Sequence, residues 1–416
     1  MKRAGIFGAG LMVVLLAQPV AAQSLNTSEG DAPAERTQMK PIGSEQGFAD
    51  WLAGFRPRAV AAGIAPDVLD RALAQARFDP KIVERDRNQS EFTKTIWDYL
   101  DTAVSEDRIR HGQRALAQHG ALLSRIEADY GVDRHVVAAI WGLESAYGSF
   151  RGDIPTIGAL ATLAYDARRA AFFEAELMAA LKIIGNGDVT PQAMRGSWAG
   201  AMGHTQFMPS SWWAHAVDFD GDGRRDVWSD DPADALASAA AYLRHWGWTS
   251  GAPWGLEVRL PDGFDYDQTT ERVKKPVAEW QALGVVPMAG GVLPDHGLAS
   301  VLLPGGARGA AFLIFSNFQV IERYNTADAY VIAVGHLADR LRGGPAIAAS
   351  WPRELRALSL AERMELQERL GAAGFDPQGV DGRIGPNTIA AVKAFQRAGG
   401  MVPDGYASLE ILQALR

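Results

Sequence analysis

The 416-residue chain contains no cysteine, has no excess of positive charge and has no long apolar run after its first residues. Without cysteine it cannot form a disulfide scaffold, a thiolate nucleophile, a zinc ribbon, an iron–sulfur cluster or a lipid-modified cysteine anchor. Its 41 basic and 49 acidic residues give a net charge of −8, which argues against nucleic acid as a partner because phosphate binding needs a basic surface. The 8 histidines form no His-Glu-x-x-His motif or comparable cluster, so we expect no cofactor in catalysis.

The N-terminus has the pattern of an export signal. Met1-Lys2-Arg3 is basic, residues 4–16 form a short apolar run, and Val20-Ala21-Ala22 places small residues before a cleavage position. This pattern predicts a cleavable signal peptide at residues 1–22 and a soluble protein of the periplasm. An uncleaved anchor helix is the alternative, although the run is shorter than the roughly 20 residues that a membrane span needs. Residues 23–45 are predicted to form a flexible leader, because they are polar with little apolar content.

The periodicity of apolar residues divides the rest of the chain into parts. Spacings of three and four predict helices through most of the first half of the chain. The pattern changes over about residues 255–323, where alternation typical of strands and a hairpin appears. We therefore predict a mainly α protein. It has a large helical domain at 46–345 that contains this small β element, a linker at 346–354 and a small, separate C-terminal domain at 355–416.

One carboxylate lies on the apolar face of a predicted helix. Asp133 fits the N-cap of this helix and Gly148 fits the position just after its last turn. The residues three, four and seven positions before Glu144 are large and apolar: Trp141, Ile140 and Val137. Burial among them favours the neutral acid, which raises the pKa toward the range where a carboxylic acid protonates a glycosidic oxygen. The alternative is a structural glutamate held by an arginine or by backbone donors.

A second stretch, residues 197–211, combines small residues with hydroxyl and amide side chains. Glycines let a polymer approach the backbone, and serine or glutamine side chains bind hydroxyl and acetamide groups. Seven of the 12 tryptophans lie between Trp198 and Trp254, where their faces suit stacking against sugar rings. For any single tryptophan, a place in the core is the alternative.

These two stretches resemble the lytic murein transglycosylase B family. Glu144 lies in Trp-Gly-Leu-Glu-Ser-Ala-Tyr-Gly, which precedes Ser-Trp-Ala-Gly-Ala-Met-Gly-His-Thr-Gln-Phe-Met-Pro-Ser-Ser, and the similarity covers about residues 46–341. The resemblance implies a lysozyme-like helical catalytic domain around a long groove, with Glu144 as its single catalytic acid/base. The substrate-binding residues that it implies are Arg168, Arg169, Ser197, Gln206, Tyr242, Tyr324, Asn325 and Tyr330.

The family reaction cleaves the β-1,4 bond between N-acetylmuramic acid and N-acetylglucosamine in peptidoglycan without water. By this resemblance, Glu144 protonates the leaving oxygen and then accepts the proton of the muramoyl 6-hydroxyl, which attacks C1 and closes a 1,6-anhydro ring. A second carboxylate is not obligatory, because the nucleophile is tethered within the substrate. The alternatives are a muramidase that hydrolyses the same bond and a non-catalytic scaffold that binds the cell wall.

Residues 218–226 match the first half of an EF-hand loop, Asp-x-Asp-x-Asp-Gly. Position 12 of such a loop is Ser229 instead of glutamate, so an aspartate further along must close the site through a longer loop. The predicted ligands are Asp218, Asp220, Asp222, the carbonyl of Arg224 and Asp231. We favour a structural Ca²⁺ with no role in proton transfer, and a solvated turn is the alternative.

The C-terminal residues 355–416 resemble the three-helix peptidoglycan-binding domain that many cell-wall enzymes carry. The resemblance rests on Leu366-Gln367, on Gly374-Phe375 and on the turn Asp381-Gly382-x-x-Gly385 before a further helix. It implies a tether that raises the local concentration of substrate. Peptidoglycan glycan strands are therefore the expected partner, with proteins of cell-wall synthesis or division as further candidates. We expect no nucleic acid and no lipid anchor.

Overall fold

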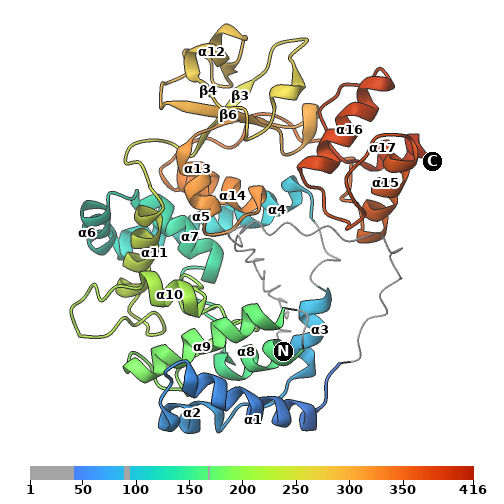
Figure 1. The fold of residues 1–416 in the computed structure, drawn as a ribbon. Helices are drawn as coiled ribbons and strands as arrows, with labels where there is room; N and C mark the ends of the chain where they lie inside the picture. The colour runs from blue at the N-terminus through green and yellow to red at the C-terminus, as the bar shows by residue number, and fades with distance from the viewer. Residues whose placement is uncertain (1–41, 89–93, 167–168) are drawn as a thin grey trace, which may run out of the picture.

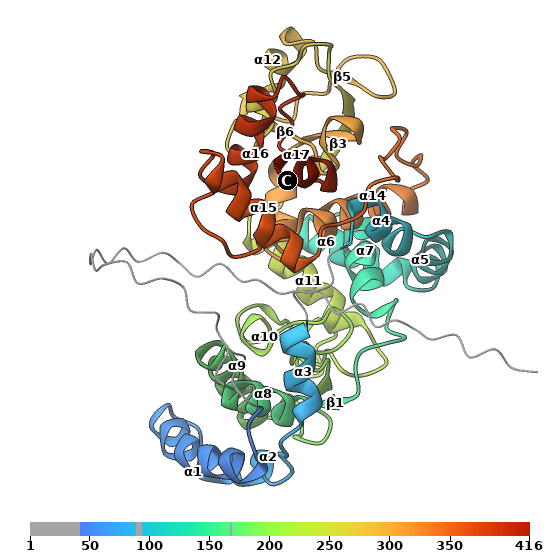
Figure 2. The ribbon, with the colours of Figure 1, turned by 90° about the vertical axis from the view of Figure 1, so that its right-hand side faces the viewer.

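A computed structural model of the chain describes residues 42–88, 94–166 and 169–416 (Figures 1 and 2). The predicted signal peptide lies outside these residues, as do most of the predicted leader and Arg168. Over the described residues the fold is mainly α, as predicted, with seventeen α-helices, two short 3₁₀ helices and seven short strands. None of the helices in these ranges is both long and apolar enough to cross a membrane.

One group of helices surrounds the packed pair α8 and α9, near the bottom of Figure 1. The group consists of α1 (Glu45–Ala61), α2 (Pro66–Leu73), α3 (Pro80–Asn88), α8 (Thr156–Tyr165), α9 (Ala170–Asn186) and α10 (Pro209–His215). Local signals set several starts: the Ser44 side chain caps α1 by accepting from the Gly47 amide at 3.1 Å, and prolines occupy the first positions of α2 and α10. Phe48 contacts Phe78 and Tyr165, which ties α1 to α8.

A second group of helices encloses α7, which is buried along most of its length. This group consists of α4 (Ile96–Ala103), α5 (Glu106–Gln118), α6 (Gly120–Tyr130), α7 (Arg134–Ser145), α11 (Ala233–His245), α13 (Ser316–Glu322) and α14 (Asp328–Leu341). The apolar pattern runs on from Ala115 to Tyr130, but the helix breaks at His119, whose φ of −109° and ψ of 22° end α5 and begin α6. The break turns α6 away, so that one periodic stretch provides two walls around α7.

The predicted β element is a five-stranded antiparallel sheet of order β4-β6-β7-β3-β5. The elements of this region are β3 (Gly255–Arg259), β4 (Lys275–Pro276), α12 (Val277–Ala282), β5 (Val286–Pro287), β6 (Leu298–Leu302), β7 (Ala311–Ile314) and the 3₁₀ turns η1 (Tyr266–Gln268) and η2 (Gly306–Arg308). Alternate residues of β7 face opposite sides, with Phe312 in the helical core and Leu313 in a separate core around Trp280. The hairpin expected from the sequence is confirmed as β6 and β7. A small ladder of β1 (Ile154–Pro155) and β2 (Arg195–Gly196) lies apart from this sheet.

The C-terminal domain has its own core and three helices, as predicted: α15 (Leu360–Ala372), α16 (Pro386–Ala398) and α17 (Leu409–Leu415). Ser359 and Glu362 form a capping box at the start of α15. Gln367 lies inside the domain, where its amide bonds the turn at Gly382 and the hydroxyl of Thr388. The Asp-Gly-x-x-Gly turn is therefore held from within the domain by this glutamine.

The C-terminal domain is packed against the rest of the molecule, beside the sheet in Figure 1. Its Lys393 ammonium donates to the Tyr266 carbonyl at 2.6 Å, and Asp404 accepts from the Ala307 amide at 2.8 Å. In the preceding segment, Arg353 pairs with Asp101 of α4 at 2.7 Å. These contacts join residues that are far apart in the sequence, and the periodicity of apolar residues does not predict such contacts.

Candidate active site

Helix α7 places Glu144 in its last turn. The Asp133 carboxylate caps the helix by accepting from the His135 amide at 2.8 Å, so the predicted N-cap is confirmed. Every residue of α7 from Val136 to Ser145 is buried except Glu144, which keeps a limited exposure to solvent. Its carboxylate therefore combines an apolar surrounding with access for a ligand.

The α7 helix ends differently from the prediction. It stops at Ser145, and Ala146 and Tyr147 both have left-handed backbones, with φ of 48° and 59°. The Ser145 hydroxyl donates to the His204 carbonyl at 2.6 Å and accepts from the Gly148 amide at 3.0 Å. Two non-glycine residues in this conformation carry strain, which persists only where surrounding contacts fix the chain. The turn thereby joins Glu144 to the second motif of the sequence.

Tyr330 of α14 lies directly on the candidate acid. Its hydroxyl donates a hydrogen bond to Glu144 Oε1 at 2.6 Å. Burial raises the pKa of Glu144 to about 7, and the hydrogen bond from Tyr330 opposes this rise. A pKa raised toward neutral pH suits a carboxyl group that both gives and accepts a proton.

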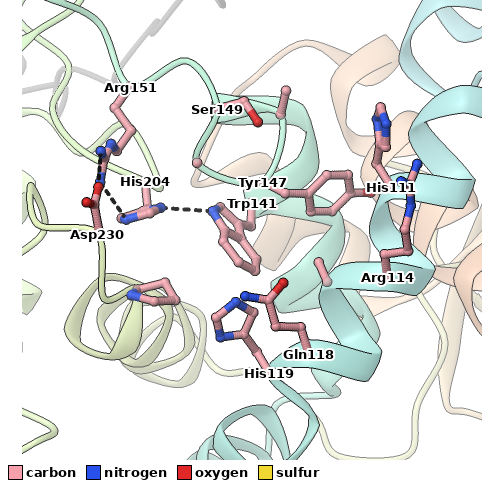
Figure 3. A pocket seen from close by; sticks show the side chains of 14 residues that line it. His111, Arg114, Gln118, His119, Trp141, Tyr147, Ser149, Arg151, His204 and Asp230 are labelled. Carbon is pink, nitrogen blue, oxygen red and sulfur yellow. Dashed lines mark hydrogen bonds and ion pairs between the residues drawn. The ribbon is translucent and has the colours of Figure 1, made fainter.

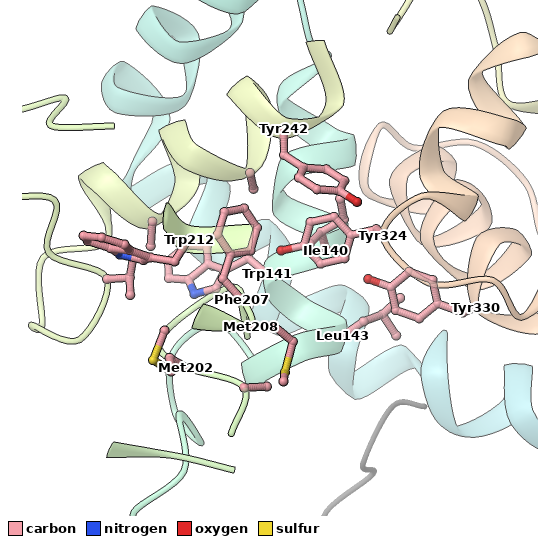
Figure 4. Close-up of a cluster of buried hydrophobic side chains, with 14 of the residues drawn as sticks. Ile140, Trp141, Leu143, Met202, Phe207, Met208, Trp212, Tyr242, Tyr324 and Tyr330 are labelled. Atoms are coloured by element: carbon pink, nitrogen blue, oxygen red, sulfur yellow. The ribbon is translucent and has the colours of Figure 1, made fainter. Parts of the chain in front are cut away.

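Three of the predicted tyrosines follow one another away from Glu144 (Figure 4). The rings of Tyr330 and Tyr324 are stacked with centroids 6.5 Å apart, and Tyr324 meets Tyr242 edge-on at 5.3 Å. The Tyr324 hydroxyl donates to the Thr205 carbonyl at 2.5 Å, and that of Tyr242 donates to the Arg323 carbonyl. All three side chains are buried, so the row forms a rigid wall beside the acid.

The motif at residues 196–207 is a tight turn that closes on itself through Met202 and Phe207. Ser197 is buried, and its hydroxyl accepts from the Ala201 amide at 3.1 Å. Gln206 has a left-handed φ of 51°, and its amide nitrogen donates to the carbonyls of Gly203 at 2.8 Å and Arg151 at 3.0 Å. Both predicted residues thus hold the turn in shape.

The remaining predicted groove residues have partners of their own. Arg169 pairs with Asp86 at 2.5 Å, and its guanidinium lies over the Phe173 ring at 4.8 Å. Asn325 is buried and accepts from the Ala327 amide at 3.0 Å, which leads the chain into α14. No hydrogen bond or ion pair joins Arg169 or Asn325 to Glu144 among the described residues, whereas Tyr330 is bonded to it directly.

Tyr99 of α4 and Arg108 of α5 also lie near the end of α7 and are not among the residues predicted from the sequence. Burial raises the pKa of Tyr99 and the negative charge of Glu144 raises it further, so its hydroxyl lies within electrostatic reach of the acid. The Arg108 guanidinium donates to the Gly142 carbonyl near the end of α7. Tyr99 falls within an apolar helical stretch and looks like a core residue, so the local pattern offered no signal for it.

The Asp218 loop brings three predicted ligands together. The carboxylate oxygens of Asp218, Asp220 and Asp222 all lie within 4.8 Å of one another, and the three residues are exposed. The Asp218 carboxylate also accepts from the backbone amides of Gly221 at 2.8 Å and Gly223 at 2.9 Å, which curls the loop around it. Three converging carboxylates are a donor set that fits a hard cation such as Ca²⁺.

Asp231, the predicted closing ligand, is not part of this group, and its role as a ligand stays a prediction. Its carboxylate accepts from the Ala233 amide at 3.0 Å, at the start of α11. The loop is closed instead by Asp234, which is buried and accepts from the Phe219 amide at 2.7 Å and the Asp226 amide at 2.8 Å. An acidic residue in the first turn of a helix is common, so Asp234 gave no distinct signal.

Two family models and a curated relative match the chain. The family model of the transglycosylase SLT domain matches residues 47–339, and that of the peptidoglycan binding domain matches residues 359–415. The chain is 34% identical over 246 residues to the membrane-bound lytic murein transglycosylase B of Escherichia coli K12. The match covers 58% of this chain and spans 65% of the length of that relative.

Two solved structures extend these matches to three dimensions. SltB3 from Pseudomonas aeruginosa, crystallised with NAG-NAM-pentapeptide, is 50% identical with a TM-score of 0.87, and the match covers 89% of this chain and 100% of that one. The lytic transglycosylase Slt35 of Escherichia coli, crystallised with calcium, is 30% identical with a TM-score of 0.59, and the match covers 72% of this chain and 93% of that one.

Proposed function

The chain belongs to the transglycosylase SLT family, and from that membership we propose that it is a peptidoglycan lytic transglycosylase. It cleaves the β-1,4 bond between N-acetylmuramic acid and N-acetylglucosamine and leaves 1,6-anhydromuramoyl ends. Glu144 acts as both acid and base, and the peptidoglycan glycan strand is the substrate. The relatives named above, a lytic murein transglycosylase and an enzyme bound to NAG-NAM-pentapeptide, support this substrate class.

The observation that carries the proposal is a buried acid that bonds Tyr330 and forms no hydrogen bond or ion pair with another charged side chain among the described residues. Burial and Tyr330 account for the pKa of about 7 at Glu144, and no second carboxylate of the described chain contributes to it. A glycoside hydrolase uses two carboxyl groups about 5–9.5 Å apart, one of which activates water or attacks the sugar. A single neutral acid suits a reaction whose nucleophile belongs to the substrate, which argues against the muramidase alternative.

The geometry assigns the proton to one oxygen of Glu144. Tyr330 donates to Oε1, so the proton of the neutral acid is carried by Oε2. The acid gives this proton to the glycosidic oxygen as the C1–O4 bond breaks. The carboxylate then accepts the proton of the 6-hydroxyl as the C1–O6 bond forms, which restores the acid without consuming water. The Tyr330 hydrogen bond stabilises the carboxylate during the interval between the two transfers.

Around this acid we assign substrate binding to the residues implied by the resemblance: Arg168, Arg169, Ser197, Gln206, Tyr242, Tyr324, Asn325 and Tyr330. The row of buried tyrosines supports this assignment, because it fixes the shape of the wall beside the acid. A rigid wall also holds the glycosidic bond of the bound substrate within reach of Glu144. Positioning of this kind lowers the activation barrier of the cleavage.

Product analysis tests the reaction. Purified sacculi digested with the protein should release muropeptides that are one water lighter than reducing-end products, as mass spectrometry measures. Products with reducing ends only would establish the muramidase instead. An absence of both kinds from a folded sample would support the non-catalytic scaffold.

A structural Ca²⁺ at Asp218, Asp220 and Asp222 is part of the same proposal, supported by their converging oxygens and by the calcium complex of Slt35. The ion would stiffen the loop that Asp234 closes, and no proton transfer involves it. Added CaCl₂ should raise the Tm of chelator-treated protein, and Asp220→Asn should remove this rise. A Tm that does not respond to calcium would contradict the site.

Export and tethering complete the proposal. The signal pattern of residues 1–22 supports a soluble periplasmic enzyme, so mature protein from the periplasm should begin at Gln23. The match at residues 359–415 supports tethering to peptidoglycan, so a chain lacking these residues should sediment less with purified sacculi than the full chain. Proteins of cell-wall synthesis or division are the further partners that we propose.

A further inference from the structure

A cavity of about 450 Å³ lies beside the end of α7 (Figure 3). Its walls come from α5, from the turn that follows α7 and from the loops of His204 and Asp230. Neither Glu144 nor any of the proposed groove residues lines it, so it is distinct from the candidate active site. Its volume is in the range of pockets that hold small organic ligands, about 300–1,000 Å³.

The α5 wall of the cavity is polar and cationic. His111, Arg114 and Gln118 are three, four and seven residues apart, so the spacing places them on one face of the helix, and all three line the cavity. No acidic partner for Arg114 is present in the described part of the chain, and its Nε donates only a long hydrogen bond of 3.4 Å to the Arg110 carbonyl. The guanidinium is exposed and therefore available to an incoming anion.

The opposite wall adds a second arginine whose charge is already balanced. Arg151 donates to Asp230 at 2.7 Å, and these two residues are the other permanently charged groups in the lining. His204 accepts from the Trp141 indole at 3.1 Å and donates from its other ring nitrogen to the Ser229 carbonyl at 2.8 Å. Burial lowers the pKa of His204, so it stays neutral. Two arginines against one aspartate leave the cavity positive in a protein of net charge −8.

The floor of the cavity is aromatic and rigid. Trp141 is buried, and Tyr147 and His119 meet its ring edge-on at 5.8 and 5.4 Å. Tyr147 is locked by its hydrogen bond to the Arg108 carbonyl at 3.0 Å and by Gly142, where an added Cβ would lie 2.5 Å from its ring. Such a site has its shape before a ligand arrives, which lowers the entropic cost of binding.

We propose that this cavity is a second binding site, for the peptide stem of the substrate, in which Arg114 binds a peptide carboxylate. The inference rests on the proposed function for the identity of the peptide, since NAG-NAM-pentapeptide is the ligand of a relative. An unpaired guanidinium recognises a carboxylate by parallel hydrogen bonds. The Gln118 amide suits the peptide groups of the stem, and the aromatic floor suits its apolar side chains.

The test measures binding by calorimetry on full-length Glu144→Gln protein, which does not consume its ligands. Three probes are titrated: the free stem pentapeptide, the same peptide with its carboxylates amidated, and a tetramer of N-acetylglucosamine. Arg114→Gln is compared with Arg110→Gln, an exposed arginine of the same helix that pairs with Asp107 and does not line the cavity. Thermal melting verifies that both variants are folded.

The free pentapeptide should bind at least about tenfold more tightly than its amidated form, because a hydrogen bond between two charged groups is stronger than one to a neutral amide. Arg114→Gln should remove this advantage and Arg110→Gln should keep it, while the tetrasaccharide binds all variants alike. Equal affinity for the two peptides, equal behaviour of the two variants, or no peptide binding at all would overturn the second site. A missing tetrasaccharide complex together with missing anhydro products from wild-type protein would instead count against the proposed function.

Discussion

Two glutamates, Glu144 at the end of α7 and Glu176 in the middle of α9, share a setting but differ in their partners. Both lie on helices with buried apolar neighbours, and burial raises the pKa of both. Glu176 accepts two hydrogen bonds from Ser210, one from its hydroxyl at 2.6 Å and one from its amide at 2.9 Å. Glu144 accepts one hydrogen bond from Tyr330 and keeps one oxygen open.

The difference separates a structural acid from a reactive one. Glu176 caps the start of α10, and its two oxygens are both engaged by one serine. The structural alternative that the sequence left open for Glu144 is therefore present in the molecule, but at Glu176. Glu144 differs because its second carboxylate oxygen has no hydrogen-bond partner among the described residues and the residue is partly exposed to solvent, where a substrate can reach it.

The largest expected effect is on turnover by Glu144→Gln. The amide keeps the shape of the side chain but cannot transfer a proton, so the rate on purified sacculi should fall at least about 1,000-fold. The release of anhydro-muropeptides measures it, and sedimentation with sacculi should persist. Retained turnover would show that Glu144 is not the catalytic acid, and the distinction between Glu144 and Glu176 would then be wrong.

Glu176→Gln should have the opposite effect: it should lower stability and leave turnover unchanged. The substitution replaces one of the two acceptor oxygens by an NH2 donor, so the Ser210 hydroxyl hydrogen loses its buried acceptor at a cost of about 2 kcal/mol. For a domain of about 300 residues that corresponds to a Tm lower by roughly 3 °C in thermal denaturation. Anhydro product per folded molecule should be unchanged, and a loss comparable to that of Glu144→Gln would give Glu176 a role in the reaction.

The sequence predicted the parts of this comparison that depend on local pattern. Helical spacing placed Glu144 among buried apolar residues, and Asp133 marked the start of its helix. The order of elements and the β6–β7 hairpin also followed from periodicity and turn residues. Periodicity alone does not distinguish the two glutamates, because Glu176 has buried Phe173 and Ala180 at similar spacings.

The features that the sequence did not predict depend on contacts between residues far apart in the chain. Tyr330 is 186 residues from Glu144, and Tyr99 looks like a core residue in its helix. The end of α7 was misplaced because Ala146 adopts a left-handed backbone that its own residue type disfavours and the His204 loop stabilises. The docking of the C-terminal domain depends on pairs such as Arg353 with Asp101, which no local pattern contains.

A smaller effect should appear in the pH dependence of stability. The pKa of Glu144 is raised from 4.5 to about 7 on folding, so the folded state binds more protons between these values and the free energy of unfolding falls as pH rises through this window. Glu144→Gln removes this loss. Its Tm should exceed that of the wild type by a few degrees at pH 8 and match it near pH 5.

The Tm of Glu176→Gln at pH 8 and near pH 5 serves as the comparison. That variant should melt below the wild type at both pH values, because its defect is an unpaired donor. If the Tm of Glu144→Gln tracks that of the wild type across the whole range, Glu144 is ionised without cost in the folded protein. The raised pKa, and with it the distinction from an ordinary surface acid, would then be wrong.

The smallest expected effect is a shift of the alkaline limb of the rate profile in Tyr330→Phe. Turnover needs the neutral acid, so activity falls as pH rises through about 7, the pKa of Glu144. The hydrogen bond from Tyr330 stabilises the carboxylate, so its removal raises the pKa and moves this limb upward by up to about one pH unit. Tyr324→Phe is the matched control, because its hydroxyl bonds the Thr205 carbonyl rather than Glu144 and its loss should leave the limb in place. A limb that moves equally in both variants would mean that the aromatic row as a whole, and not one hydrogen bond, sets the protonation of Glu144.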